Sequence, residues 1–231
     1  MKPIIKVDRV KSVEEAVELE SLGVDIVSIS LGEDVRFDDN RQVSENLACE
    51  IRKSLSSSKA CCQLALNEES LSFIKDYNFD LIQLLEFELH SIDRHFLKED
   101  EVRIIYSGIT ASHDDAPSWI FSSFENEDCL NASYFHLDLL ADLENSWSFL
   151  KHECPKYSDT LQISDINNLA SQYPILIGLN PSIEAIQDCL NIVPNICGIN
   201  FTLASEPINN NVHWLDYSSL INILQALRSG S

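Results

Sequence analysis

The sequence predicts a single α/β domain in which eight parallel strands close into a (β/α)8 (TIM) barrel. Short apolar runs alternate with helical patterns along the whole chain. No change of composition divides its 231 residues, a length common for one such barrel. The final third contains an apolar run, a glycine turn, an Asn-Pro helix start and a second apolar run, between Pro174 and Thr202, as in a strand–helix–strand unit.

The alternative is an open doubly wound sheet with about six strands, which would show the same alternation. No Gly-x-Gly-x-x-Gly turn follows the first apolar run, and this favours the closed barrel.

The first half of the chain begins with a strand at Ile4–Val7, which ends at Asp8-Arg9. Ser12, followed three residues later by Glu15, has the pattern of a capping box, and the helix that it opens ends at Gly23. The next elements expected are a strand at Asp25–Ser30, a helix from Ser44 to about Leu55, a strand at Cys61–Leu66, a helix at Glu68–Tyr77 and a strand at Leu81–Leu84.

The second half supplies the remaining strands, expected at Val102–Ser107, Tyr134–Leu137, Ile175–Ile177 and Gly198–Phe201. Between Ser107 and Asn131 the sequence is polar and aromatic, and periodicity does not decide between an irregular helix and a loop. A final helix is expected after Trp214-Leu215-Asp216. The barrel therefore spans 1–228, and 229–231 form a short tail.

The composition excludes several classes of partner. A formal charge of −21 makes nucleic acid and anionic membranes improbable partners, whereas a basic protein partner remains open.

No run of about 18 apolar residues and no secretory signal pattern occurs, so a cytoplasmic protein is expected. The seven cysteines show no Cys-x-x-Cys spacing, which indicates buried free thiols and no metal site.

Ligand-binding groups are expected where the strands end. In parallel α/β folds, catalytic and binding groups lie at the carboxyl ends of the strands, which here are Gly178–Asn180 and Thr202–Ala204. The six glycines are far fewer than the roughly 16 that the usual ~7% would give, so glycine loops that cradle phosphate must be few.

Short motifs follow one another at the predicted strand ends in an order that resembles a known family. They are Lys6-Val7-Asp8-Arg9-Val10, Arg41-Gln42-Val43-Ser44, Asn67, Ile82-Gln83-Leu84, Leu137-Asp138, Gly178-Leu179-Asn180-Pro181 and the run 198–206. With them the chain resembles the phosphoribosylanthranilate isomerases, (β/α)8 enzymes of tryptophan biosynthesis that perform an Amadori rearrangement. The resemblance covers about 4–228.

The resemblance implies roles for individual residues. Asp138 matches the family's general acid, and Asp8 replaces the cysteine that is its general base. Such a pair suits the reaction, because one group removes a proton from C2 of the ring-opened sugar imine while another protonates the ring oxygen. Arg41 matches the arginine that holds the substrate carboxylate, and no cofactor is implied. The other substrate-binding positions implied are Gln83, Gly178, Asn180 and Thr202.

Simpler structural roles remain open for several of these residues. Asp8 could accept backbone hydrogen bonds at the strand end, and Arg41 could pair with Asp38 or Asp39. Arg9 stands where the family has glycine, so it either fills the pocket or supplies a new anion contact. His136 points the same way as Asp138, two residues along the strand, and we interpret it as a structural histidine of the barrel interior.

Other departures from the family concern the phosphate site. The family's His-Gly is Leu85-Glu86 here, and its glycine-rich loop is replaced by 139–142. Its paired glycines after the seventh strand are Ile177-Gly178, and its Ser-Ser-Gly after the eighth is Thr202-Leu203-Ala204. Added Cβ atoms restrict the approach of backbone N–H groups to a phosphate, so that site is expected to be weakened or lost.

Two functions are therefore predicted. One is acid/base isomerisation of a small anionic amino-sugar or aryl-amine metabolite. The other is a catalytically silent barrel that acts as a binding or regulatory protein through its acidic surface. The oligomeric state stays open.

Overall fold

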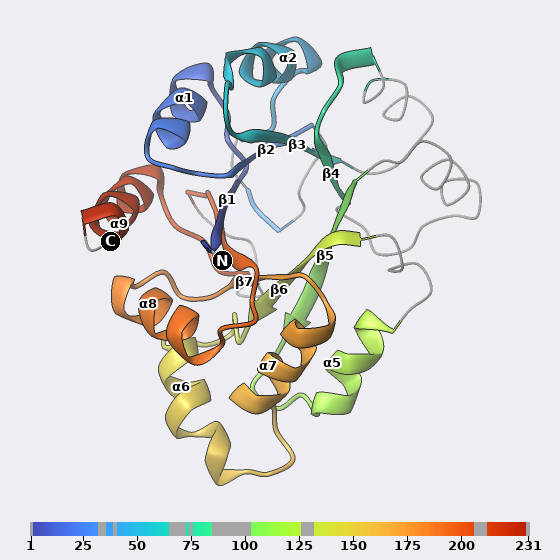
Figure 1. The fold of residues 1–231 in the computed structure, drawn as a ribbon, viewed down its shortest axis with the longest axis vertical. Coiled ribbons are helices and arrows are strands. Elements are labelled where there is room, and N and C mark those ends of the chain that lie inside the picture. The colour runs from blue at the N-terminus through green and yellow to red at the C-terminus, as the bar shows by residue number, and fades with distance from the viewer. Residues whose placement is uncertain are drawn as a thin grey trace.

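The computed structural model describes residues 2–31, 36–38, 41–64, 73, 76–84, 103–125, 132–205 and 212–229. Eight parallel strands form a closed barrel in sequence order. The helices form an outer ring around these strands (Figure 1). The predicted (β/α)8 barrel is confirmed, and the open doubly wound sheet is excluded.

The elements alternate along the chain. The strands are β1 Ile4–Asp8, β2 Ile26–Ser30, β3 Lys59–Leu64, β4 Leu81–Leu84, β5 Ile104–Ala111, β6 Ala132–Leu139, β7 Ile175–Gly178 and β8 Gly198–Thr202. The described helices are α1 Val13–Ser21, α2 Glu45–Ser54, α5 Pro117–Phe124, α6 Ser146–His152, the short 3-10 helix η2 Cys154–Lys156, α7 Ile163–Gln172, α8 Ile183–Ile192 and α9 Tyr217–Ser229.

Hydroxyl caps start several of these helices, as the sequence predicts for the first two. Ser12 accepts a hydrogen bond from the backbone N–H of Glu15, and Ser44 accepts one from Leu47. Each cap satisfies one of the backbone donors left over at a helix N-terminus.

Pairing of the first strand with the last closes the barrel. Every residue of β1 has a partner in β8, from Ile4 opposite Gly198 to Asp8 opposite Thr202. At Gly198 the strands approach so closely that a Cβ atom would lie 1.9 Å from the carbonyl oxygen of Ile4. Only glycine fits this position without a shift of backbone.

Several predicted boundaries are wrong. β3 ends at Leu64 instead of Leu66, and β5 runs on to Ala111 because irregularities in its register with β6 carry the pairing past Ser107. The segment left open between helix and loop contains α5, with Pro117 in its first turn. The tail begins later than expected, because α9 includes Ser229. Asn67, Leu85, Glu86 and most of the helix expected at Glu68–Tyr77 lie outside the described residues.

The barrel interior has two different halves. Inward side chains at the amino ends of the strands form an apolar cluster, which we call the apolar half: Ile26, Cys61, Leu81 and Ile105. Two residues further along each strand the inward side chains are polar, as the alternation of a strand requires. This buried polar half contains Lys6, Asp8, Gln63, Gln83, His136, Asp138, Asn200 and Thr202.

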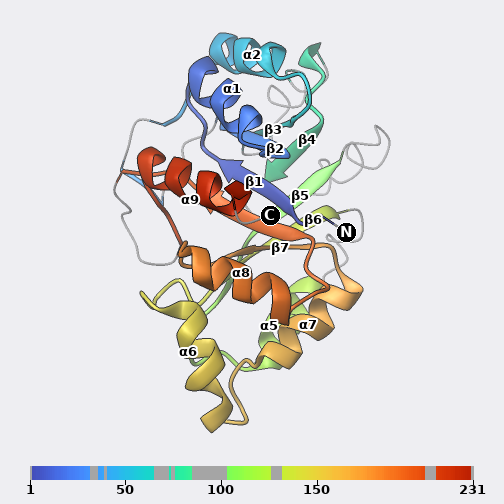
Figure 2. The same cartoon turned by 60° about the vertical axis from the view of Figure 1, so that its left-hand side comes forward.

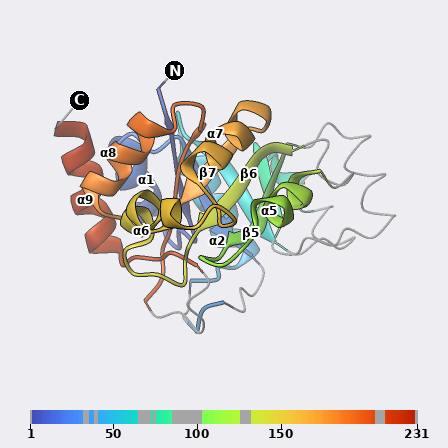
Figure 3. The ribbon, with the colours of Figure 1, turned by 90° about the horizontal axis from the view of Figure 1, so that it is seen from below.

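Seen from the side, α1 and α2 cover one part of the barrel wall and α5 to α8 cover the opposite part (Figure 2). The two marked ends of the chain lie on the same side of the barrel (Figure 3). In the described part of the chain, no helix is both long and apolar enough to cross a membrane. Six cysteines are free thiols, five of them buried, as predicted; Cys129 lies outside the described residues.

Candidate active site at the carboxyl end of the barrel

Asp8, the last residue of β1, belongs to a buried network that joins β1 to β8. The ammonium group of Lys6 donates to Asp8 Oδ1 and to Asn200 Oδ1, the latter at 2.8 Å. The side-chain amide of Asn200 donates to the other oxygen of Asp8 at 3.0 Å. Gln83 reaches the same oxygen from β4, at 3.5 Å. The carboxylate of Asp8 therefore has side-chain partners, and the simpler role as an acceptor of backbone hydrogen bonds does not describe it.

The surroundings of Asp8 keep it ionised at neutral pH. Burial raises the pKa of the carboxyl group, but the charge of Lys6, followed by that of His136, lowers it, and the net pKa lies below the ordinary value. Removal of one partner from a buried ion pair costs about 3–5 kcal/mol, because the other charge is left uncompensated.

Asp138 lies on β6 beside His136 and is equally buried. His136 Nε2 lies 3.5 Å from Asp138 Oδ1, an ion-pair distance that exceeds a good hydrogen bond. Burial raises the pKa of Asp138, whereas His136 lowers it, and the net pKa is below the usual one. His136 thus lowers the pKa of both aspartates, and all three buried side chains belong to the polar half of the barrel interior.

Gly178 at the end of β7 makes room for this pair. A Cβ atom at this position would lie 2.2 Å from Asp138 Oδ1 and 3.1 Å from His136 Nε2. The glycine is therefore needed by the carboxylate itself, which is a different reason from the predicted contact with substrate.

Several polar atoms in the polar half have no hydrogen-bond partner among the described residues. They are both amide atoms of Gln63, Oε1 of Gln83, both ring nitrogens of His136 and Oδ1 of Asp138. An unpaired buried polar group costs roughly 1–3 kcal/mol, so these atoms call for water or a polar ligand between them.

The two predicted arginines are held by the protein itself. Arg41 Nε donates to the carbonyl oxygen of Arg9 at 2.8 Å, and its Nη2 pairs with Glu15 at 2.6 Å. The ion-pair partner is therefore Glu15 on α1 and not Asp38, which with Asp39 was the structural alternative to a substrate contact; Asp39 lies outside the described residues.

Arg9 follows β1 at the carboxyl end of the barrel. Its backbone has φ of 65°, in the left-handed region that favours the glycine found there in the family. Its side chain is buried, donates to the carbonyl oxygen of Leu203 at 3.0 Å and lies over the ring of Phe37. The side chain therefore occupies space beside Phe37 and Leu203, and the predicted contact with an anion stays a prediction.

The backbone donors after β8 are also occupied. The N–H of Leu203 donates to the carbonyl oxygen of Asp8 at 3.2 Å, and the N–H of Ala204 donates to Leu215 at 3.1 Å. Asn180 is engaged as well, because its side chain donates to the carbonyl oxygen of Glu144. Neither backbone N–H at the end of β8 is available to hold a phosphate in this structure.

The structure brings together part of the predicted site. Asp8 and Gln83 share a network with Asn200, whose side chain also donates to Thr202 Oγ1 at 3.3 Å, and Asp138 adjoins Gly178. Arg41 and Asn180 are bonded elsewhere.

Lys6, Gln63 and Asn200 were missed, although each lies two residues from another inward-facing position, and this spacing is the signal that could have found them. No cluster of metal-ligand side chains occurs among the described residues.

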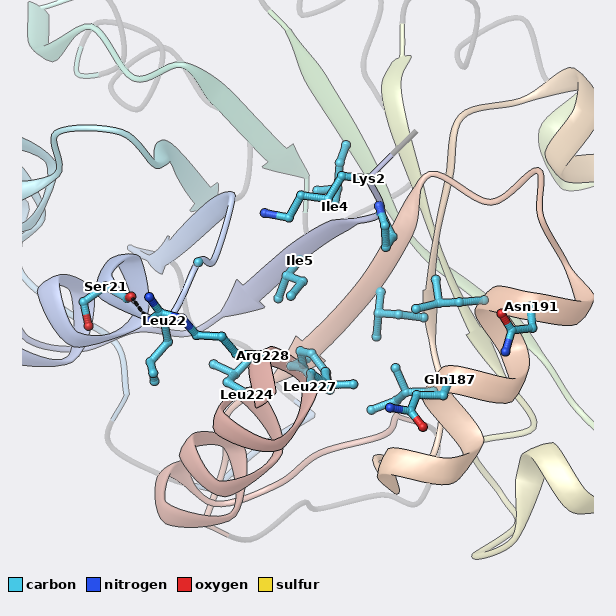
Figure 4. Close-up of a pocket in the computed structure, with 16 residues that line it drawn as sticks. Lys2, Ile4, Ile5, Ser21, Leu22, Gln187, Asn191, Leu224, Leu227 and Arg228 are labelled. Carbon is cyan, nitrogen blue, oxygen red and sulfur yellow. Dashed lines mark hydrogen bonds between the residues drawn. The ribbon is translucent and has the colours of Figure 1, made fainter. Parts of the chain in front are cut away.

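Three grooves formed by the described residues lie outside this region. One of them, of about 720 Å³, runs along the outer wall of the barrel between α8 and α9 (Figure 4). Two smaller ones lie between α6 and α8 and at the amino end of the barrel. None of these three is lined by Asp8 or Asp138.

Comparison with solved structures shows where this fold occurs. Phosphoribosylanthranilate isomerase from Thermotoga maritima superposes with a TM-score of 0.67 at 14% identity, over 99% of this chain and 100% of that one. The enzyme from Thermus thermophilus gives 0.65 at 14%, and that from Thermococcus kodakaraensis gives 0.64 at 16%, each over 99% and 100% of the two chains. The chain thus has the fold of the phosphoribosylanthranilate isomerases. No protein-family model and no curated protein sequence matches it.

Proposed function

We propose that this chain is an isomerase that transfers protons on a small amino-sugar or aryl-amine metabolite. The observation that supports this most directly is the shared interior of Asp8, His136 and Asp138 at the carboxyl end of the barrel, where enzymes with this architecture carry their catalytic groups. The likeness to solved isomerase structures is consistent with such chemistry.

The proton movements divide between two sides of the barrel. Asp8, ionised at neutral pH, takes the proton from the carbon next to the imine of the ring-opened sugar. Across the interior, the His136–Asp138 pair delivers a proton to the sugar ring oxygen as the ring opens. An imidazole can both give and take protons near neutral pH, whereas a carboxyl group with a lowered pKa is ionised there. The predicted role of Asp138 as acid is thus shared with its neighbour.

The charge of the substrate remains a prediction. A small anionic metabolite was expected, with its carboxylate on Arg41. Such a contact requires that the carboxylate replaces Glu15 as the partner of this guanidinium. The occupied N–H groups after β8 favour a substrate without phosphate.

Turnover measurements test the proposal. Phosphoribosylanthranilate and its phosphate-free analogue are offered to the wild type, Asp8→Asn and Asp138→Asn, and isomerisation is followed by fluorescence. We expect each variant to lose about 10²-fold or more in kcat/KM. Asp188→Asn, which removes a half-buried carboxylate that pairs with Lys151 and accepts from Trp147 far from the carboxyl-end network, is the matched control and should keep full activity. Absence of turnover of both compounds by the folded wild type would contradict the proposal.

A catalytically silent barrel is the second candidate, and one observation favours it. Arg9 is buried at the carboxyl end of β1, where its guanidinium lies over Phe37 and donates to the carbonyl oxygen of Leu203, so its side chain occupies space that the family's glycine leaves free. In that case the acidic chain would serve as a binding or regulatory protein for a basic partner in the cytoplasm. Arg9→Gly distinguishes the two candidates. If the side chain of Arg9 blocks an active site, its removal should raise the turnover of the two compounds.

A further inference from the structure

The outer wall of the barrel carries an apolar groove far from the carboxyl end. It lies between α8 and α9, with Ile5 of β1 and with Leu224 and Leu227 of α9 along it (Figure 4). Ile199 of β8 also lines it. Its volume of about 720 Å³ falls within the usual range of sites for small organic ligands.

The charges around this groove differ from those of the rest of the chain. The sequence has 37 acidic residues and 16 basic ones, yet no acidic residue lines the groove. Two basic residues do, Lys2 before β1 and Arg228 near the end of α9. A locally positive site on a strongly negative protein selects anions at that place.

Both cations are positioned at the rim and keep donors for a ligand. Arg228 donates one hydrogen bond to the carbonyl oxygen of Ser21, at 2.9 Å, and this bond orients the side chain. Because a guanidinium has five donor hydrogens, others can reach a ligand. Lys2 lies 3.6 Å from Asp25 in an exposed pair, an interaction that a bound anion can replace at little cost.

We propose that this groove binds an amphipathic carboxylate, a compound with an aliphatic body and one anionic end. The apolar side chains along the groove remove the aliphatic body from water, and Lys2 and Arg228 hold the carboxylate. None of the groups assigned to proton transfer lines the groove, so this site does not depend on the proposed isomerase activity.

A dye-displacement experiment tests the site on the whole chain. Anilinonaphthalene sulfonate, itself an apolar anion, reports occupancy by its fluorescence, and decanoate competes with it. Decanol, which has the same chain length without the charge, is the ligand control. We expect decanoate to displace the dye and decanol to do so only weakly. Added salt should weaken decanoate binding, because the cations at the rim are exposed.

Variants at the rim identify the binding place. In the double variant Lys2→Gln/Arg228→Gln, decanoate affinity should fall at least about fivefold, because two exposed charge contacts are lost. Decanol affinity should not change. Lys156→Gln, which removes an exposed cation elsewhere, is the matched control. Leu227→Trp should abolish binding of both compounds by filling the groove.

Two results would overturn the proposal. One is displacement by decanoate that the double variant and Leu227→Trp leave unchanged. The other is a dimer in light scattering that Leu227→Trp dissociates, since a second copy of the chain would then cover the groove.

Discussion

The two halves of the barrel interior are buried to the same extent but are stabilised in different ways. In the apolar half, Ile26, Cys61, Leu81 and Ile105 form one hydrophobic cluster. In the polar half, Lys6, Asp8 and Asn200 neutralise and bond one another, whereas Gln63 and His136 have unpaired atoms.

This difference shows which half the fold needs and which half is available for chemistry. Apolar contacts stabilise a fold without hydrogen-bond partners in fixed directions, so the apolar half can fill the amino end of the barrel and serve stability alone. Buried charges and amides are costly unless each has its partner, and they are retained where they serve a purpose other than stability. In enzymes with this fold, residues at the amino ends of the strands generally serve stability, and residues at the carboxyl ends carry out the chemistry.

Among the substitutions that compare the two halves, Lys6→Met should have the largest effect on stability. It leaves the buried carboxylate of Asp8 without its cation, so we expect a loss of about 3–5 kcal/mol in the free energy of unfolding, measured with urea. The double variant Lys6→Met/Asp8→Asn should recover part of this loss. If Lys6→Met alone costs less than about 1 kcal/mol, the ion pair does not stabilise the polar half.

Leu81→Ala tests the apolar half. Leu81 is fully buried, and its truncation leaves a cavity, so unfolding should become easier by about 3 kcal/mol. Proton-transfer activity, measured at a temperature where the variant is folded, should stay within about twofold of the wild type, since the change lies at the opposite end of the barrel. A large loss of activity at unchanged stability would show that the two halves are coupled.

Acid should weaken only the polar half. The pKa values of Asp8 and Asp138 are lowered in the folded state, so their stabilising contribution is complete above the ordinary value of 3.8. It is lost as the pH falls from there through the lower folded-state pKa values. Urea unfolding between pH 6 and 3 should show this decline, and the slope should become flatter in Asp138→Asn. An unchanged slope in that variant would show that other carboxyl groups cause the decline.

Gln63→Leu should change the stability least, and it should stabilise the fold where the other substitutions destabilise it. Both amide atoms of Gln63 lack partners, so an apolar side chain of similar size should stabilise the fold by about 1 kcal/mol. Gln172→Leu, on the exposed face of α7, serves as the control and should change stability by no more than about 0.5 kcal/mol. Destabilisation by Gln63→Leu would mean that water or a ligand bonds this amide in the native state.

The fold could be predicted because its signal is local. Each strand is a short apolar run, and serine caps mark the first helices, so the alternation of elements is visible without any knowledge of contacts. The aromatic segment before β6 was harder, since α5 has no side-chain cap and leaves Trp119 exposed. The end of β5 depends on pairing with β6, which no local pattern reveals.

The site could be predicted only in outline. Asp8 and Asp138 were found because the motifs at the predicted strand ends resemble those of a known family, but their partners depend on the closed barrel. The pair of Arg41 with Glu15 joins a loop to a helix, and proximity in sequence suggested other acids. Lys6 was seen as part of a motif, whereas its contact with Asn200 crosses the seam between the first and last strands.

That seam has a consequence for how the chain reaches its native state. Lys6 and Asn200 are 194 residues apart, and β1 pairs with β8 along its whole length. Contacts of such high sequence separation carry the full entropy of loop closure and form slowly. Until β8 docks, Asp8 lacks both Asn200 and a dry environment, so the charged network forms only when the first and last strands pair. The same residues that define the candidate site thereby report closure of the barrel.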